Sequence, residues 1–167
     1  QEGDVQAQIN QVEDQLAKGV DAIALAPGDP NAFAPIVDDA IKSGVPVVFV
    51  DTKGINEGVT FIGTNNKNGA ALAAKFICDK TPKGSDVAVL TGIESQSTAL
   101  LRRDGAVAGL KACGLNLVAT QTAEWDTAKG RSVTESIILK NPNIKAIFAS
   151  NDNMGLGAIQ ALKDADM

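Results

Sequence analysis

Apolar residues occur along the chain in two alternating patterns. Short continuous apolar runs, typical of strands buried in a parallel sheet, are followed by segments whose apolar residues lie three and four positions apart, as on one face of a helix. Because the two patterns alternate throughout, we predict an α/β fold with parallel sheets and helices on both faces. The strands are expected at residues 20–26, 45–50, 59–62, 87–90, 115–119 and 144–149.

The run at residues 144–149 is nearly all apolar and predicts a central strand buried on both faces. Asn151 and Asp152 follow it at the start of a helix, where short polar side chains cap free backbone N–H groups. In open α/β sheets the carboxyl end of a strand is also where ligands bind. The pattern favours capping for Asp152. It leaves both roles open for Asn151, whose amide donates and accepts hydrogen bonds.

Two other polar residues stand at strand ends. Asp51 directly follows the strand at 45–50, and Trp125 lies in a polar segment after the strand at 115–119. Asp51 thus occupies the same structural position as Asn151, after a strand and before a loop. The amide of Asn151 suits a neutral, hydroxyl-rich ligand better than a phosphate or a metal.

A helix is expected from about residue 98, with Leu101, Ala108 and Leu110 facing inward. Arg102 and Arg103 fall near its start, where the helix dipole disfavours cations. An arginine at such a position suggests a specific contact. A solvated surface side chain remains the simpler interpretation for at least one of the two.

Composition narrows the function classes. The net charge is −5 without a long run of Lys or Arg, which indicates no nucleic-acid partner, and no apolar run reaches the roughly 20 residues that cross a bilayer. The sequence contains no histidine, which removes Ser–His and Cys–His nucleophile pairs and histidine zinc sites. No nucleotide-binding glycine motif is present. We therefore expect a binding protein, not an enzyme, with no catalytic residue, metal site or cofactor.

Cys78 and Cys113 both fall in helical patterns. Small buried side chains are the favoured interpretation, and a disulfide stays open because sequence does not show whether two cysteines lie close together.

Five segments together carry a resemblance to a known family. They are EGDVQAQINQVEDQ, VVFVD ending at Asp51, LLRRDGA around Arg102, ATQTAEWD around Trp125 and NPNIKAIFASNDNMGLGA around Asn151. With these segments the chain resembles periplasmic sugar-binding proteins of the ribose type, and most closely the allose-binding branch. The resemblance implies that Asp51, Arg102, Trp125 and Asn151 contact a monosaccharide. Thr52, where the ribose binder has an arginine, departs from the ribose pattern.

The resemblance also implies how the protein works. Residues 1–64 would belong to an N-terminal lobe and residues 65–167 to a C-terminal lobe, with a sugar held between them by hinge closure. The partners would be the membrane permease of an ABC transporter and a chemoreceptor. The protein would be periplasmic, or extracytoplasmic and lipid-anchored in a Gram-positive source. The family pattern further implies strands before residue 1 and after residue 167, so that the chain would be truncated at both ends.

Two alternatives stay open. The first is the sugar-sensing core of a lactose-repressor-type transcription factor, which shares the fold. The second is a small α/β enzyme that uses Asp51 as nucleophile or phosphoacceptor, like a response regulator. The second is disfavoured because no acidic pair for a metal accompanies Asp51.

Overall fold

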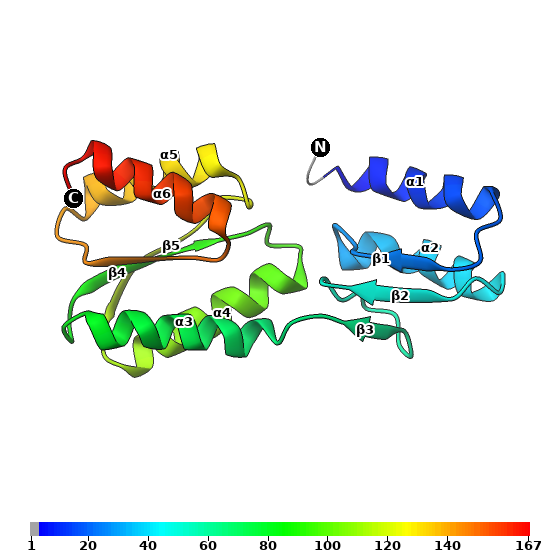
Figure 1. Cartoon of the computed structure of the whole chain (residues 1–167), viewed down its shortest axis with the longest axis horizontal. Coiled ribbons are helices and arrows are strands. Elements are labelled where there is room, and N and C mark those ends of the chain that lie inside the picture. The colour runs from blue at the N-terminus through cyan, green and yellow to red at the C-terminus, as the bar shows by residue number, and fades with distance from the viewer. Residues whose placement is uncertain (1–3) are drawn as a thin grey trace. The chain divides into compact units, whose positions relative to one another are not determined.

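A computed structural model describes residues 4–167. The chain forms two compact units (Figure 1). The first unit comprises the residues up to Thr64 together with Ser95–Thr98, and the second comprises Asn65–Glu94 and Ala99–Met167. Each unit is built around a three-stranded parallel sheet.

The sheet of the first unit has the order β1-β2-β3, with two helices packed on it. Asp4 caps the first helix by accepting a hydrogen bond from the backbone N–H of Ala7 (2.9 Å), as short polar residues do at helix starts. Phe33, Val37 and Phe49 are fully buried between helices and sheet. The elements are α1 (Val5–Ala17), β1 (Ile23–Leu25), α2 (Pro30–Lys42), β2 (Val47–Val50) and β3 (Thr60–Ile62).

The sheet of the second unit has the order β5-β4-β6, so β4 is the central strand. Within residues 4–167, β6 pairs with β4 alone, and three of its four residues are half-buried, so the prediction that residues 144–149 form the central strand is wrong for the described part of the chain. The elements are α3 (Asn66–Lys80), β4 (Asp86–Thr91), α4 (Ser97–Ala112), β5 (Asn116–Thr122), α5 (Thr127–Lys140), β6 (Ala146–Ala149) and α6 (Asp152–Asp164).

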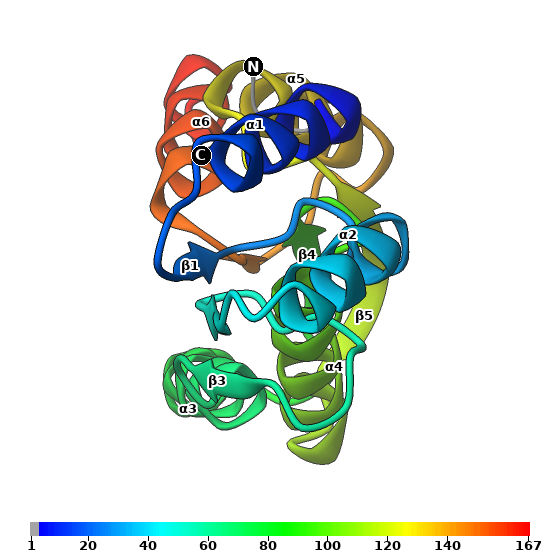
Figure 2. The ribbon, with the colours of Figure 1, turned by 90° about the vertical axis from the view of Figure 1, so that its right-hand side faces the viewer.

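Strand β4 explains why helices cover both faces of this sheet. Successive side chains of a strand point to opposite faces. Val87 and Val89 pack into an apolar cluster with α3 and α4, whereas Ala88 and Leu90 pack into a second cluster with α5 and α6. All four side chains are fully buried, and Figure 2 shows the two helix pairs above and below the sheet. The expected α/β class, with parallel sheets between helices, is confirmed.

Glycines let the helices of each pair approach closely. A Cβ at Gly105 of α4 would collide with the backbone carbonyl of Lys67 in α3, and a Cβ at Gly157 of α6 would collide with the carbonyl of Thr127 in α5. Small residues therefore form the helix contacts, and Gly109 of α4 likewise lies against Ala74 of α3.

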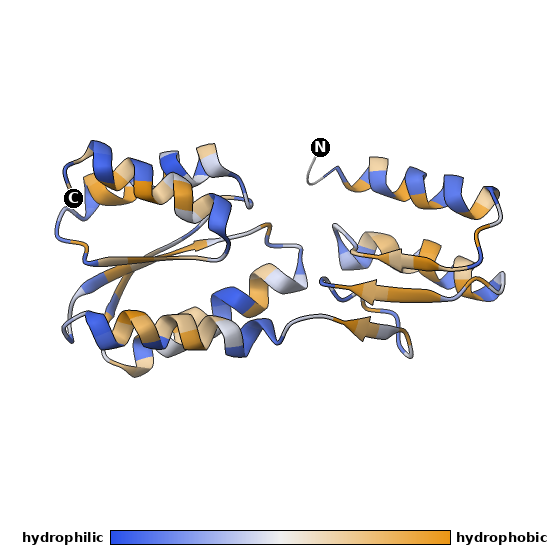
Figure 3. Ribbon diagram, viewed as in Figure 1, coloured by the Kyte–Doolittle hydropathy of each residue, from blue (hydrophilic) through white to orange (hydrophobic). Residues whose placement is uncertain are grey.

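These close contacts explain an error in the predicted burial of α4. Leu101 and Ala108 were expected to face inward but are exposed, while Leu110 is buried as predicted. The spacing of large apolar residues predicted the wrong face, because Gly105 and Gly109 of α4 make the contact with α3. Figure 3 shows apolar and polar residues mixed along the helices, in contrast to the largely apolar strands.

Cys78 near the end of α3 and Cys113 just after α4 form a disulfide, with their Cα atoms 6.1 Å apart. The favoured interpretation of two separate buried thiols is therefore wrong. Both residues are half-buried, and the bond joins the two helices at the end farthest from Arg102 along α4.

Candidate functional site

The carboxyl ends of β4, β5 and β6 lie at the same edge of the second sheet, because the three strands are parallel. The structure brings Arg102, Trp125 and Asn151 together at this edge through direct contacts. They come from α4, from the segment after β5 and from the residue before α6. Asp51, the fourth candidate, belongs to the first unit.

Arg102 contacts three separate segments. Its Nε donates a hydrogen bond to Oδ1 of Asn66 (2.8 Å), and its Nη1 donates to the carbonyl oxygen of Ser150 (2.9 Å). The Cζ atom lies 5.6 Å from the centroid of the Trp125 ring, within the range of a cation–π contact. Asn66 and Ser150 are buried, so the guanidinium is held firmly from one side.

The hydrogen-bond acceptors of Arg102, Asn66 and Ser150, are neutral, and within residues 4–167 no carboxylate forms an ion pair with its guanidinium. Its charge is therefore available for a ligand, and hydrogen bonds from a charged donor are stronger than those from a neutral one. Arg103 differs, since its guanidinium forms an ion pair with the neighbouring Asp104 (2.8 Å). Arg102 lies in the second turn of α4, so its contacts, not the dipole at the first turn, explain its position.

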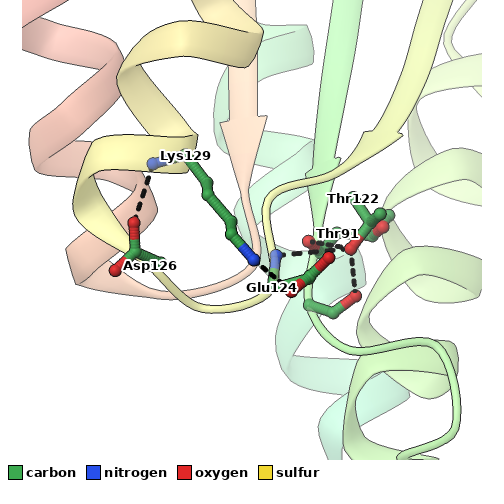
Figure 4. A network of polar contacts seen from close by, with 6 residues as sticks. Thr91, Thr122, Glu124, Asp126 and Lys129 are labelled. Carbon is green, nitrogen blue, oxygen red and sulfur yellow. Dashed lines mark hydrogen bonds and ion pairs between the residues drawn. The ribbon is translucent and has the colours of Figure 1, made fainter. Parts of the chain in front are cut away.

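Trp125 lies in a segment with unusual backbone geometry. Glu124 (φ 50°) and Trp125 (φ 66°) are both in the left-handed region, which non-glycine residues seldom adopt. Figure 4 shows how polar contacts hold this segment. Glu124 forms an ion pair with Lys129, and Asp126 caps α5 by accepting from the N–H of Lys129 (2.8 Å).

Asn151 is the N-cap of α6. Its Oδ1 accepts from the N–H of Met154 (3.0 Å), and its Nδ2 donates to the backbone carbonyl of Trp125 (3.2 Å). The sequence pattern favoured a capping role for Asp152, and this prediction is wrong. Asp152 is an exposed residue in the first turn of α6, where the helix dipole stabilises its negative charge. An amide has two N–H groups and two acceptor lone pairs, so Asn151 keeps capacity for a ligand beyond these two contacts.

Asp51 directly follows β2, as predicted, and is exposed with φ 58°. Its backbone N–H donates to the carbonyl of Ile62 (2.9 Å), which ties the segment to β3. Among the described residues of the first unit, none forms a hydrogen bond or ion pair with its carboxylate. Thr52, next to it, is buried at 5% exposure.

Sequence reasoning missed Asn66, Ser150 and Gly92. Asn66 and Ser150 orient Arg102, and Gly92 lies against the Trp125 ring. Asn66 and Ser150 did carry a signal, since both are polar residues at the start of a helix or the end of a strand. Their burial, which gives the contacts their strength, is not visible in a single sequence.

Within residues 4–167, no group of three or more Asp, Glu, Cys or His side chains is arranged to hold a metal ion. The same part of the chain has no helix both long and apolar enough to cross a bilayer.

The sequence matches the family described as periplasmic binding protein domain over residues 1–167. The chain belongs to this family. Periplasmic binding proteins of this kind are substrate-binding proteins and not enzymes.

Relatives within the family include sugar binders. The D-ribose/D-allose-binding protein of Pseudomonas aeruginosa is 32% identical and matches 98% of the chain and 54% of its own length. The ribose import binding protein of Bacillus subtilis is 37% identical, with the same two coverages, 98% and 54%. The chain thus spans about half the length of the curated relatives it matches.

A solved relative agrees with this assignment. An ABC transporter periplasmic solute-binding protein from Actinobacillus succinogenes, determined with bound D-allose, superposes with a TM-score of 0.90 at 34% identity, over 97% of the chain and 60% of that structure. The resemblance inferred from the sequence motifs is therefore confirmed at the level of family and fold.

Proposed function

We propose that the protein captures a monosaccharide outside the cytoplasm and delivers it to the membrane permease of an ABC transporter. The observation that carries this proposal is the convergence of Arg102, Trp125 and Asn151 at one edge of the second sheet, in a member of the periplasmic binding protein family. Relatives named for ribose and allose binding support a monosaccharide as the ligand.

The three side chains would contact different parts of a sugar. The Arg102 guanidinium and the Asn151 amide offer donors and an acceptor for hydroxyl groups, with the charged donor making the stronger bonds. The Trp125 indole provides an apolar surface for the C–H side of a sugar ring. None of these groups is a nucleophile beside a base, so the arrangement suits binding without chemistry.

Asp51 would add a fixed carboxylate acceptor from the first unit. In this proposal residues 1–64 belong to the N-terminal lobe and residues 65–167 to the C-terminal lobe, and binding closes the two lobes around the sugar by a hinge motion. A transport permease, and a chemoreceptor as a second partner, would then recognise the closed form.

The disulfide between Cys78 and Cys113 separates this proposal from the transcription-factor alternative. Structural disulfides persist in the periplasm and outside cells, and they are rare in the cytosol, where a repressor binds DNA. The disulfide therefore supports an extracytoplasmic location, and with it the transport role.

Calorimetry on the full-length protein with D-allose, D-ribose, D-galactose and D-glucose tests the proposal. At least one sugar should bind, and Arg102→Ala should weaken that binding more than tenfold, because loss of one partner from a buried charged hydrogen bond costs roughly 2–5 kcal/mol. Arg103→Ala is the matched control and should change affinity less than threefold, since its partner Asp104 is a surface residue. No binding of any sugar, or equal losses for the two variants, would count against this site.

A further inference from the structure

Gly92 directly follows β4 and is buried. Its φ lies outside the left-handed region, so its backbone conformation is open to other residues. A Cβ at this position, however, would collide with three atoms of the Trp125 indole, Cζ2, Cε2 and Cη2. The absence of a side chain at Gly92 thus makes room for the indole ring. The φ angle at this position does not by itself require glycine.

The backbone of Gly92 is tied to the segment that carries the indole. Thr122 at the end of β5 donates from Oγ1 to the carbonyl oxygen of Gly92 (2.7 Å), and the N–H of Glu124 donates to the same hydroxyl (3.3 Å). Beside this contact, the N–H of Ala123 donates to the carbonyl of Thr91 (2.8 Å). The hydrogen bonds through the Thr122 hydroxyl form a bridge between the carboxyl ends of β4 and β5 (Figure 4).

The left-handed backbone at Glu124 and Trp125 directly follows the bridge. Backbone strain persists where the surrounding contacts fix the conformation. The bridge from Thr122 fixes the segment on one side, and contact with Gly92 fixes the ring on the other. The indole then reaches the guanidinium of Arg102.

We propose that Gly92 is a positioning residue of the sugar site: by lacking a side chain, it seats the Trp125 indole where it contacts Arg102 and presents its apolar surface to the ligand. This inference rests on the proposed sugar-binding function. Gly92→Ala should displace the ring, remove the cation–π contact and lower sugar affinity at least tenfold. It should also shift the emission of Trp125, because the ring leaves its half-buried environment.

The chain offers a matched control. Gly155 of α6 is half-buried, and a Cβ there would meet only the Cβ of Ala149, at an ordinary 3.7 Å. Gly155→Ala in the full-length protein should leave sugar affinity within threefold of wild type and leave the emission of Trp125 unchanged. Emission is assigned to Trp125 by subtracting the spectrum of the Trp125→Phe variant.

A double-mutant cycle isolates the proposed role. Urea unfolding, followed by circular dichroism, is measured for Gly92→Ala, Trp125→Ala, the double variant and wild type. If Gly92 serves the indole, Gly92→Ala destabilises wild type but has little effect once Trp125 is alanine. Equal destabilisation in both backgrounds overturns the inference. If Gly92→Ala does not fold, recovery of folding in the double variant supports the inference, and failure of both overturns it.

The cycle uses no sugar, so it remains decisive even if the function is different. Absence of sugar binding by wild type would refute the proposed function alone. Binding by wild type that Gly92→Ala leaves unchanged would refute the role of Gly92 in the sugar site alone.

Discussion

Removing the disulfide between Cys78 and Cys113 should destabilise the second unit without disturbing the candidate site. The bond joins residues 35 positions apart. In the chain-entropy description, a closed loop of this length lowers the entropy of the unfolded chain by about 13 cal/mol/K, which stabilises the fold by about 4 kcal/mol at 25 °C. For a urea dependence of about 2 kcal/mol/M, the Cys78→Ser/Cys113→Ser variant should unfold at a midpoint about 2 M lower.

Urea titration of the full-length protein, with the emission of Trp125 as the probe, measures this change within the second unit. Reductant should lower the midpoint of wild type to that of the double variant and leave the variant unchanged. Sugar affinity should stay within threefold, because Gly105 still packs α4 against α3 near Arg102. A loss of stability under 1 kcal/mol, with the bond verified by mass spectrometry, would refute the loop-entropy reasoning.

Two further predictions concern how the helices hold the site. Asn66→Ala in the full-length protein removes the buried acceptor of Arg102 Nε and should lower sugar affinity about tenfold by calorimetry. Asn68→Ala, at an exposed position of the same helix, should lower it less than threefold, and equal losses would show that Asn66 does not orient Arg102. Gly157→Ala should force α5 and α6 apart and lower the free energy of unfolding by about 2 kcal/mol. The control Gly69→Ala, at a position with open space around the added Cβ, should raise the free energy of unfolding by about 0.5–1 kcal/mol. A Gly157→Ala variant as stable as wild type would contradict the close packing of α5 and α6.

The strands could be predicted from sequence because a buried parallel strand is a continuous apolar run. Each of the six runs overlaps a strand, although the ends differ, as at residues 20–26, where β1 covers only Ile23–Leu25. Which strand is central could not be predicted in the same way. Residues 144–149 form a mainly apolar run, as do residues 87–90 of β4, and the position of each strand in the sheet is known only from the strand pairing.

The buried face of α4 and the pairing of the two cysteines were also difficult to predict from the sequence, because both depend on contacts between helices. In α4 the surface that contacts α3 is made by Gly105 and Gly109. A count of large apolar residues does not include glycines, so it predicted an inward position for the exposed Leu101. The pairing of Cys78 with Cys113 depends on the distance between two helix ends, which their spacing in sequence does not determine.

Part of the candidate site followed from general geometry. Parallel strands end at one edge of a sheet, and this rule predicted that the segments of Trp125 and Asn151 lie at strand ends, while the resemblance assigned both residues to a sugar site. It did not reveal that Asn151 supports the backbone of Trp125 directly, or that Gly92 leaves room for the ring. Such contacts depend on burial and on absent side chains, so they become visible only in three dimensions.

Asp51, at the end of β2, has a strained backbone conformation. With φ 58° this residue holds a conformation that glycine adopts freely and that other residues adopt at a free-energy penalty of about 1 kcal/mol. Asp166, just after α6, shares the conformation (φ 55°) and lies far along the chain from every candidate ligand residue. Glycine at either position should therefore stabilise the full-length protein by about 1 kcal/mol in urea unfolding.

The two variants should differ only in binding. Asp51→Gly should lower sugar affinity more than tenfold, because it removes an exposed carboxylate that is available to the ligand, since no described residue of the first unit binds it. Asp166→Gly should bind sugar as wild type does. Affinity within threefold of wild type for Asp51→Gly would remove Asp51 from the site. A gain in stability coupled to a loss of binding would explain why a strained position carries an aspartate: the carboxylate serves the ligand, and the backbone strain is tolerated for it.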